Sequence, residues 1–226
     1  MSGLRVNLSK SSLISIGEVP NIHLLACFFG CEVCTLPSTY LGLPLGASFK
    51  SIAVWDLIVE RFQKRLAGWK SKMLSKGGKL TLLQSTLWSL PIYYMSLFTI
   101  PASVASLLGK IMRDFLWSKQ EGNNGFHCVC WDEICHPKED GGLGIRPIRS
   151  MNKVLKTKWL WRFASEDDVL WKKVIVFKYD SDRLGWWSKK SPFAHGVGCW
   201  KSILFTLDFF KSSVRFEVGN GARVLF

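Results

Sequence analysis

The sequence predicts an α+β protein that is mainly α with a small β portion. Three apolar stripes with steps of three and four residues lie between residues 51 and 118, the spacing of a buried helix face. Short segments before residue 48 alternate apolar and polar residues, as half-buried strands do. With 226 residues, 48% of them hydrophobic, the chain is long enough for one large domain or two small ones with a real core.

The first 48 residues predict the β portion. Residues 4–8 (LRVNL) and 13–17 (LISIG) each suit a short strand. Residues 22–31 form an apolar run that we expect to be buried, and it is far shorter than the ~20 residues of a membrane span. In TYLGLPLG, residues 39–46, two glycines and a proline exclude a helix, and the leucine alternation predicts a short hairpin.

Residues 51–118 predict a bundle of three helices. Pro91 lies inside the second stripe and should kink or split that helix, and Pro101 stands where the third helix would start. The three stripes are Ile52, Trp55, Val59, Phe62, Leu66 and Trp69, then Leu80, Leu83, Leu87, Leu90, Tyr94 and Phe98, then Val104, Leu108, Ile111 and Phe115.

The rest of the chain alternates irregular and helical segments. Residues 118–127 are a loop by composition, and residues 131–145 are rich in turn residues. A helix is predicted over 148–164. Ser165 and Asp168 have the spacing of a capping box, which predicts a new helix running to about Tyr179. VGNG at 218–221 resembles a hairpin turn between two short strands.

The net charge indicates a polyanionic partner. Lys plus Arg number 30 against 17 acids, a formal charge of +13, which favours nucleic acid first and an anionic membrane second. The basic residues are concentrated in the helical parts. Eleven tryptophans suit either a core or stacking on bases.

The strongest local signal is a lysine segment between the first two stripes. Lys70, Lys72, Lys76 and Lys79 lie within ten residues, interrupted by Gly77 and Gly78. We expect a flexible loop there. Its lysines could neutralise phosphates without reading bases, or they could simply be solvated, because a lysine cluster is common.

The cysteines do not form a zinc motif. Seven stand at positions 27, 31, 34, 128, 130, 135 and 199, an odd number with irregular spacing. The Cys-x-x-Cys at 31–34 has no equal partner, so we expect free thiols in a reducing, intracellular compartment, nucleus or cytoplasm left open. No secretory signal is recognised at the N-terminus.

The acidic residues do not predict a catalytic site. Glu166, Asp167 and Asp168 suit the N-terminus of a helix, and Asp180 and Asp182 suit a turn. No histidine stands beside them as a general base. The glycines at 141–144 are not followed by the GK[ST] of a phosphate loop.

Several phrases together resemble a known family. In order they are SGLRVNLSKS, YLGLPLGA, LAGWKSKMLSKGGKLTLLQSTLWSLPIYYMSLFTIP, RDFLW, WDEICHPKEDGGLGIR, KWLWRFA, LWKKVIVFKY and VGNG. They resemble the C-terminal part of reverse transcriptases of plant non-LTR (LINE-type) retrotransposons, over essentially the whole chain. The catalytic aspartates of that family stand in an [FY]ADD phrase, which this sequence lacks.

The resemblance implies a domain order. Residues 1–48 would be a remnant of the palm edge with a primer-grip-like hairpin, and residues 49–118 a helical thumb-like domain. Residues 119–147 would be an irregular connector, and residues 148–226 a helical linker ending in a truncated β hairpin. The hairpin that grips the primer end would comprise Tyr40, Leu41, Gly42, Leu43, Pro44, Leu45 and Gly46.

The resemblance also implies a function. The thumb and linker would contact the backbone of a template–primer duplex or RNA–DNA hybrid, with Lys70, Lys72, Lys76 and Lys79 facing phosphates. No cofactor is expected in this chain, since Mg²⁺ would belong to the palm aspartates. We expect no membrane partner, and the oligomeric state is open. The alternatives are an incomplete gene model of a full RNA-directed DNA polymerase acting in cis, and an inert retroelement remnant.

Overall fold

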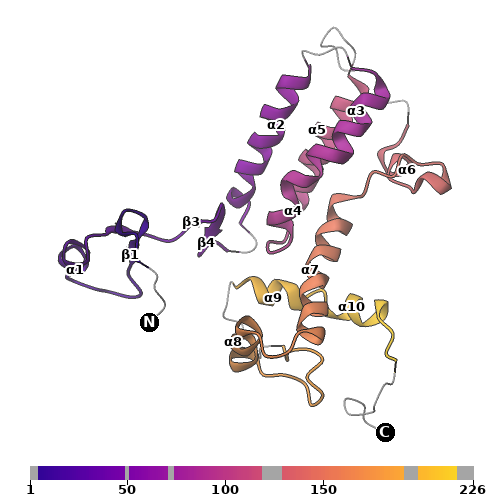
Figure 1. Ribbon diagram of the computed structural model, residues 1–226. Helices are drawn as coiled ribbons and strands as arrows, with labels where there is room; N and C mark the ends of the chain where they lie inside the picture. The colour runs from indigo at the N-terminus through magenta and orange to yellow at the C-terminus, as the bar shows by residue number, and fades with distance from the viewer. Residues whose placement is uncertain (1–4, 49–50, 71–73, 119–128, 191–197, 218–226) are drawn as a thin grey trace. The chain divides into compact units, whose positions relative to one another are not determined.

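The computed structural model describes residues 5–48, 51–70, 74–118, 129–190 and 198–217 (Figure 1). The chain divides into two compact units, Met1–Ala47 and Ser48–Phe226. Helices dominate and the strands are few and short, so the predicted mainly α fold with a small β portion is confirmed. The division into four segments at residues 48, 118 and 147 stays a prediction.

The first unit contains a small β-α-β arrangement. Strands β1 (Ser12–Ile14) and β2 (Glu32–Cys34) pair in parallel, and helix α1 (Ile22–Phe29) connects them. The strand predicted at 13–17 is present as β1 but ends at Ile14. The strand predicted at 4–8 is wrong for the described residues, because residues 5–7 have no regular structure and Leu8–Lys10 is a 3-10 helix, η1.

Helix α1 is mostly exposed. Only Ala26 is buried in it, whereas Leu24, Phe28 and Phe29 are exposed, Phe28 by 84%. The expectation that residues 22–31 are buried is therefore wrong. The physical reason is that the described strands of the first unit form sheets of two strands each, which are too small to cover this helix.

The hairpin predicted at 39–46 is confirmed. Strands β3 (Ser38–Tyr40) and β4 (Leu43–Leu45) are antiparallel, with Tyr40 opposite Leu43. The two loop residues both have positive φ, 49° at Leu41 and 78° at Gly42, as a type I′ turn requires.

The second unit begins with four successive helices. They are α2 (Asp56–Lys70, after the 3-10 turn η2, Ala53–Trp55), α3 (Lys76–Leu82), α4 (Ser89–Met95) and α5 (Ala102–Trp117). Helix α2 contacts α4 and α5, and α3 contacts α5. A π-helical turn, η3 (Leu83–Leu87), joins α3 to α4. The predicted disruption near Pro91 thus takes the form of a widened turn just before it.

The predicted stripes supply much of the core of this bundle. The members below one-tenth exposed are Trp55, Phe62, Leu66, Leu83, Leu87, Tyr94, Phe98, Val104, Leu108 and Phe115. Ile52 is an exception, because it precedes the first helix and is 57% exposed.

Two local predictions are wrong. Residues 76–79 are helical rather than a loop, because the Ser75 hydroxyl caps α3 by accepting a hydrogen bond from Gly78 N at 3.1 Å. The capping box at Ser165 and Asp168 is not formed. Ser165 ends α7 (Ile148–Ser165), its hydroxyl donates to Trp161 O, and α8 (Leu170–Tyr179) starts later.

Helix α7 confirms the helix predicted over 148–164. A connector precedes it. The connector holds α6 (Trp131–Ile134) and a 3-10 turn, η4 (Lys138–Asp140). The Gln84 amide donates to Leu143 O at 2.8 Å, so the connector is joined to η3. Gly142 is required there, because a Cβ would lie 2.1 Å from His136 O.

Helix α7 fastens the turn between α4 and α5 with a buried asparagine. Asn152 donates to Met95 O at 2.6 Å and Phe98 O at 2.8 Å, and it accepts from Ile100 N at 3.1 Å. One turn later, Lys156 is only 4% exposed.

The last helices form a hydrophobic cluster around the C-terminal half of α7. They are α8, α9 (Cys199–Leu204) and α10 (Leu207–Ser213). The buried members are Leu160, Phe163, Trp200, Ile203, Leu204, Leu207 and Phe210. The hairpin predicted around VGNG lies outside the described residues.

Candidate nucleic-acid interface

The lysine segment is only partly described. Lys70 is the last residue of α2, and Lys72 lies outside the described residues. Lys76 and Lys79 stand in the first turn of α3. The Lys76 ammonium lies 5.3 Å from the centroid of the Trp117 ring on α5, a cation–π contact.

Lys79 binds the end of another helix. Its Nζ donates to the carbonyl of Ser118 at 2.7 Å and to its hydroxyl at 2.8 Å. A cation is favourable there, because α5 ends at Trp117 with free carbonyls and the negative end of its dipole. Burial, and then the neighbouring charge of Lys76, lowers the pKa of Lys79. Lys79 therefore has a structural role that a phosphate would have to compete with.

Basic residues in the second unit fall into two groups. From Arg162 onward, five are paired with acids: Arg162–Glu166, Lys172–Asp167, Lys173–Asp168, Lys189–Asp180 and Lys190–Asp208. Before Arg162, most form no ion pair with an acid in the described part of the chain. Apart from Lys79, Lys138 and Lys156, these residues are called the unpaired basic set: Arg61, Arg65, Lys76, Lys110, Arg113, Arg146, Arg149, Lys153 and Lys158.

The hairpin presents its tip to solvent. Tyr40 is 64% exposed and Leu41 75% exposed. Gly42 and Gly46 both have positive φ, which favours glycine. The seven residues proposed as primer-grip-like are thus brought together in one small element. Their contact with a primer stays a prediction.

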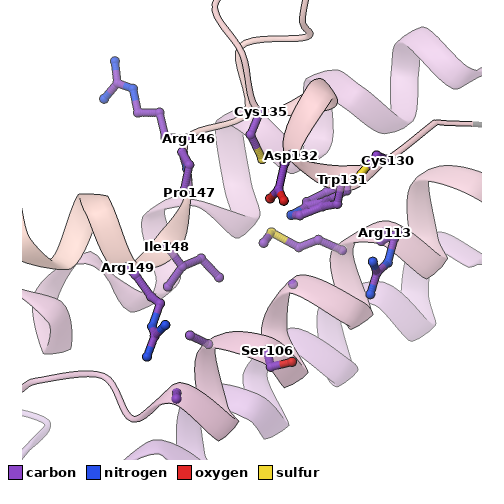
Figure 2. Close-up of a pocket in the computed structure, with 14 residues that line it drawn as sticks. Ser106, Arg113, Cys130, Trp131, Asp132, Cys135, Arg146, Pro147, Ile148 and Arg149 are labelled. Carbon is purple, nitrogen blue, oxygen red and sulfur yellow. The ribbon is translucent and has the colours of Figure 1, made fainter.

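A cavity of about 370 Å³ lies between α5, α6 and the start of α7 (Figure 2). Its wall contains Arg113 and Ser106 from α5, Trp131 and Asp132 from α6, and Arg149 from the first turn of α7. Sequence analysis did not single out these residues, because three separate segments supply them.

The cavity is positively charged. Three arginines, Arg113, Arg146 and Arg149, belong to its wall together with one acid, Asp132. Figure 2 shows the Arg146 side chain extending away from the other lining residues. The buried Arg113 Nε has no hydrogen-bond partner among the described residues. Cys135 also lines the cavity, and burial, with a smaller contribution from Asp132, raises the pKa of its thiol.

Most tryptophans belong to the core. Of the eleven, only Trp161 is exposed, at 59%. Trp69, which continued the first stripe, packs with its ring centroid 5.9 Å from that of Phe115. The tryptophan count therefore reflects packing more than an open stacking platform.

Metal ligands do not gather in the described residues. No group of three or more His, Cys, Asp or Glu there could hold an ion. His127 and Cys128, part of the second cysteine cluster, lie outside them. Nor does any described helix combine the length and apolarity of a membrane span.

Comparisons with known proteins give two relatives, both from Arabidopsis thaliana. A protein named "Putative ribonuclease H protein" is 35% identical over 170 residues, 75% of this chain and 27% of the relative. An uncharacterized mitochondrial protein is 27% identical over 139 residues, 59% of this chain and 86% of the relative. The chain thus spans about a quarter of the first relative and most of the second. No family model matches the sequence.

Proposed function

We propose that this chain is a retroelement-derived segment whose helical unit contacts the sugar–phosphate backbone of nucleic acid. More finely, it corresponds to the thumb and linker of a non-LTR reverse transcriptase holding a template–primer duplex. It does not catalyse polymerisation alone, because the sequence lacks the [FY]ADD aspartates that would hold two metal ions.

The observation that carries the proposal is the unpaired basic set. Eight cations on α2, α3, α5 and α7, with Arg146 just before α7, lack an acidic partner in the described part of the chain. By contrast, four lysines after residue 165 are each paired with an acid. Unpaired cations on a helical scaffold suit a polyanion read by its shape and backbone.

The first relative supports the same class of partner. Its name is that of a ribonuclease H, and 75% of this chain aligns with it. A protein that acts on nucleic acid would use a segment that binds the nucleic-acid backbone. The alignment covers 27% of that relative, so the segment would serve a larger protein.

The first unit supports the palm-edge reading. A two-stranded parallel sheet with an apolar helix open to solvent is marginal alone, since parallel sheets are normally covered on both faces. Such elements are expected where further strands of a palm would complete the sheet.

The test is binding of the purified chain to a labelled RNA–DNA hybrid across a salt series. We expect affinity to fall steeply with salt, by just under one unit of log–log slope for each phosphate contact. The test variant changes Lys70, Lys72 and Lys76 to Gln and keeps Lys79, which binds Ser118. If the three lysines contact phosphates, the slope should fall by about three units.

The matched control changes Lys173, Lys189 and Lys190 to Gln. These lysines are paired with acids, and the control removes the same formal charge. Loss of slope in the first variant alone supports contact by the lysine segment. Absence of hybrid binding by the wild type would refute the proposed function.

A further inference from the structure

We infer that the cavity between α5, α6 and α7 binds the phosphate group of a nucleotide. The inference rests on the proposed function only for the source of that phosphate, which can be a nucleic-acid strand or a free nucleotide. The anchors are Arg113 and Arg149, on different helices that both line the cavity.

The charge of the cavity selects an anion. Guanidinium groups stay protonated and present several N–H donors in a planar fork that matches phosphate oxygens. The wall contains one acid, Asp132, against Arg113 and Arg149, since the Arg146 side chain extends away. A phosphate therefore meets a net positive site.

The second observation is the unsatisfied Arg113. Its Nε is buried and has no partner in the described part of the chain. Because no hydrogen bond at Nε fixes this guanidinium, a phosphate oxygen in the cavity could bind its terminal nitrogens. Among the described residues, the other two atoms in this condition are the indole nitrogens of Trp55 and Trp117, and neither residue lines this cavity.

The cavity is large enough for a nucleotide, and part of its wall is uncharged. The volume of about 370 Å³ lies in the range of small-molecule sites. Trp131 offers a half-buried ring, and the Asp132 carboxylate can accept from a sugar hydroxyl or a base amine. In Figure 2 these two residues lie across the opening from Ser106 and Arg149.

The test is an NMR titration that follows the indole N–H signal of Trp131, assigned with a Trp131→Phe variant. The ligands are AMP, inorganic phosphate and adenosine. We expect a saturable shift with AMP, a weaker one with phosphate and none with adenosine. Equal shifts with adenosine and AMP would overturn the inference, because the phosphate would then contribute nothing.

Two variants separate charge from shape. Arg113→Gln combined with Arg149→Gln should weaken AMP binding at least tenfold. Ser106→Trp should block the cavity without changing its charge, and it keeps the test valid if the arginine variant fails to fold. Arg183→Gln combined with Arg215→Gln is the charge-matched control, since neither residue lines the cavity. Unchanged AMP binding in both cavity variants would overturn the inference.

The same variants in the hybrid salt series identify the source. A slope lowered by about one unit in the cavity variants assigns the phosphate to a strand, and an unchanged slope with retained AMP binding assigns it to a free nucleotide. If AMP shifts Trp131 but the wild type binds no hybrid, the proposed function fails and this inference stands. If hybrid binds but AMP gives no shift, the inference fails and the proposed function stands.

Discussion

Replacing Lys156 by Met should change how the stability of the protein depends on pH. The Lys156 ammonium donates to Thr99 Oγ1 at 2.8 Å and to Ser202 O at 3.3 Å. No acid pairs with it in the described part of the chain. Burial lowers the pKa of this lysine from 10.5 to about 8.

The sign and size follow from the two pKa values. Below pH 8 both the folded and the unfolded chain carry the proton, and the cost of burying the charge is constant. Between pH 8 and 10.5 the unfolded chain binds more protons, so stability rises with pH. Each unit between the pKa values corresponds to about 1.4 kcal/mol, so the full gain is about 3 kcal/mol.

The assay is urea unfolding followed by circular dichroism at pH 7, 8, 9 and 10. Other lysines titrate in this range in both proteins, so the difference between wild type and Lys156→Met isolates the buried group. That difference should move in favour of the wild type by about 2–3 kcal/mol by pH 10. Lys158→Met, an exposed lysine on the same helix, is the control and should show no such trend. A pH-independent difference for Lys156→Met would refute the reasoning.

Three further changes test the packing. Asn152→Ala should lower the free energy of unfolding by about 3 kcal/mol, because three buried backbone partners lose their hydrogen bonds; a loss below about 1 kcal/mol would contradict the role assigned to this amide. Ser75→Ala should cost about 1 kcal/mol by removing the cap on Gly78, whereas Ser75→Asp, which keeps an acceptor, should restore it. Gly142→Ala should cost about 1–3 kcal/mol, because its Cβ would overlap His136 O; the control is Gly68→Ala, whose Cβ would meet nothing within 4 Å, and equal thermal melts for the two variants would contradict this reasoning.

The helices of the second unit could be predicted because their signal is local. The stripes ending at Phe98 and Phe115 repeat at helical spacing, and most of their members are buried. In the lysine segment, Gly77 and Gly78 favour a loop, whereas Ser75 is a helix-capping residue and the cap prevails. The start of α3 is therefore also encoded locally.

Other features depend on contacts between distant residues and left no local signal. The apolar run in α1 predicts burial, but burial depends on which elements pack against the run, and Phe28 is exposed. The cavity joins Arg113, Trp131 and Arg149, which belong to three elements. Period and composition describe each element alone, so they cannot bring these side chains to one place.

The three hydrogen bonds of the Asn152 side chain impose an order of events during synthesis. Ile100 leaves the ribosome 52 residues before the amide that accepts its N–H. At about 5–20 residues per second, the turn after α4 waits for several seconds with its donors and acceptors open to water. The nascent bundle can form its helices in that time, but it reaches its final stability only when α7 has emerged.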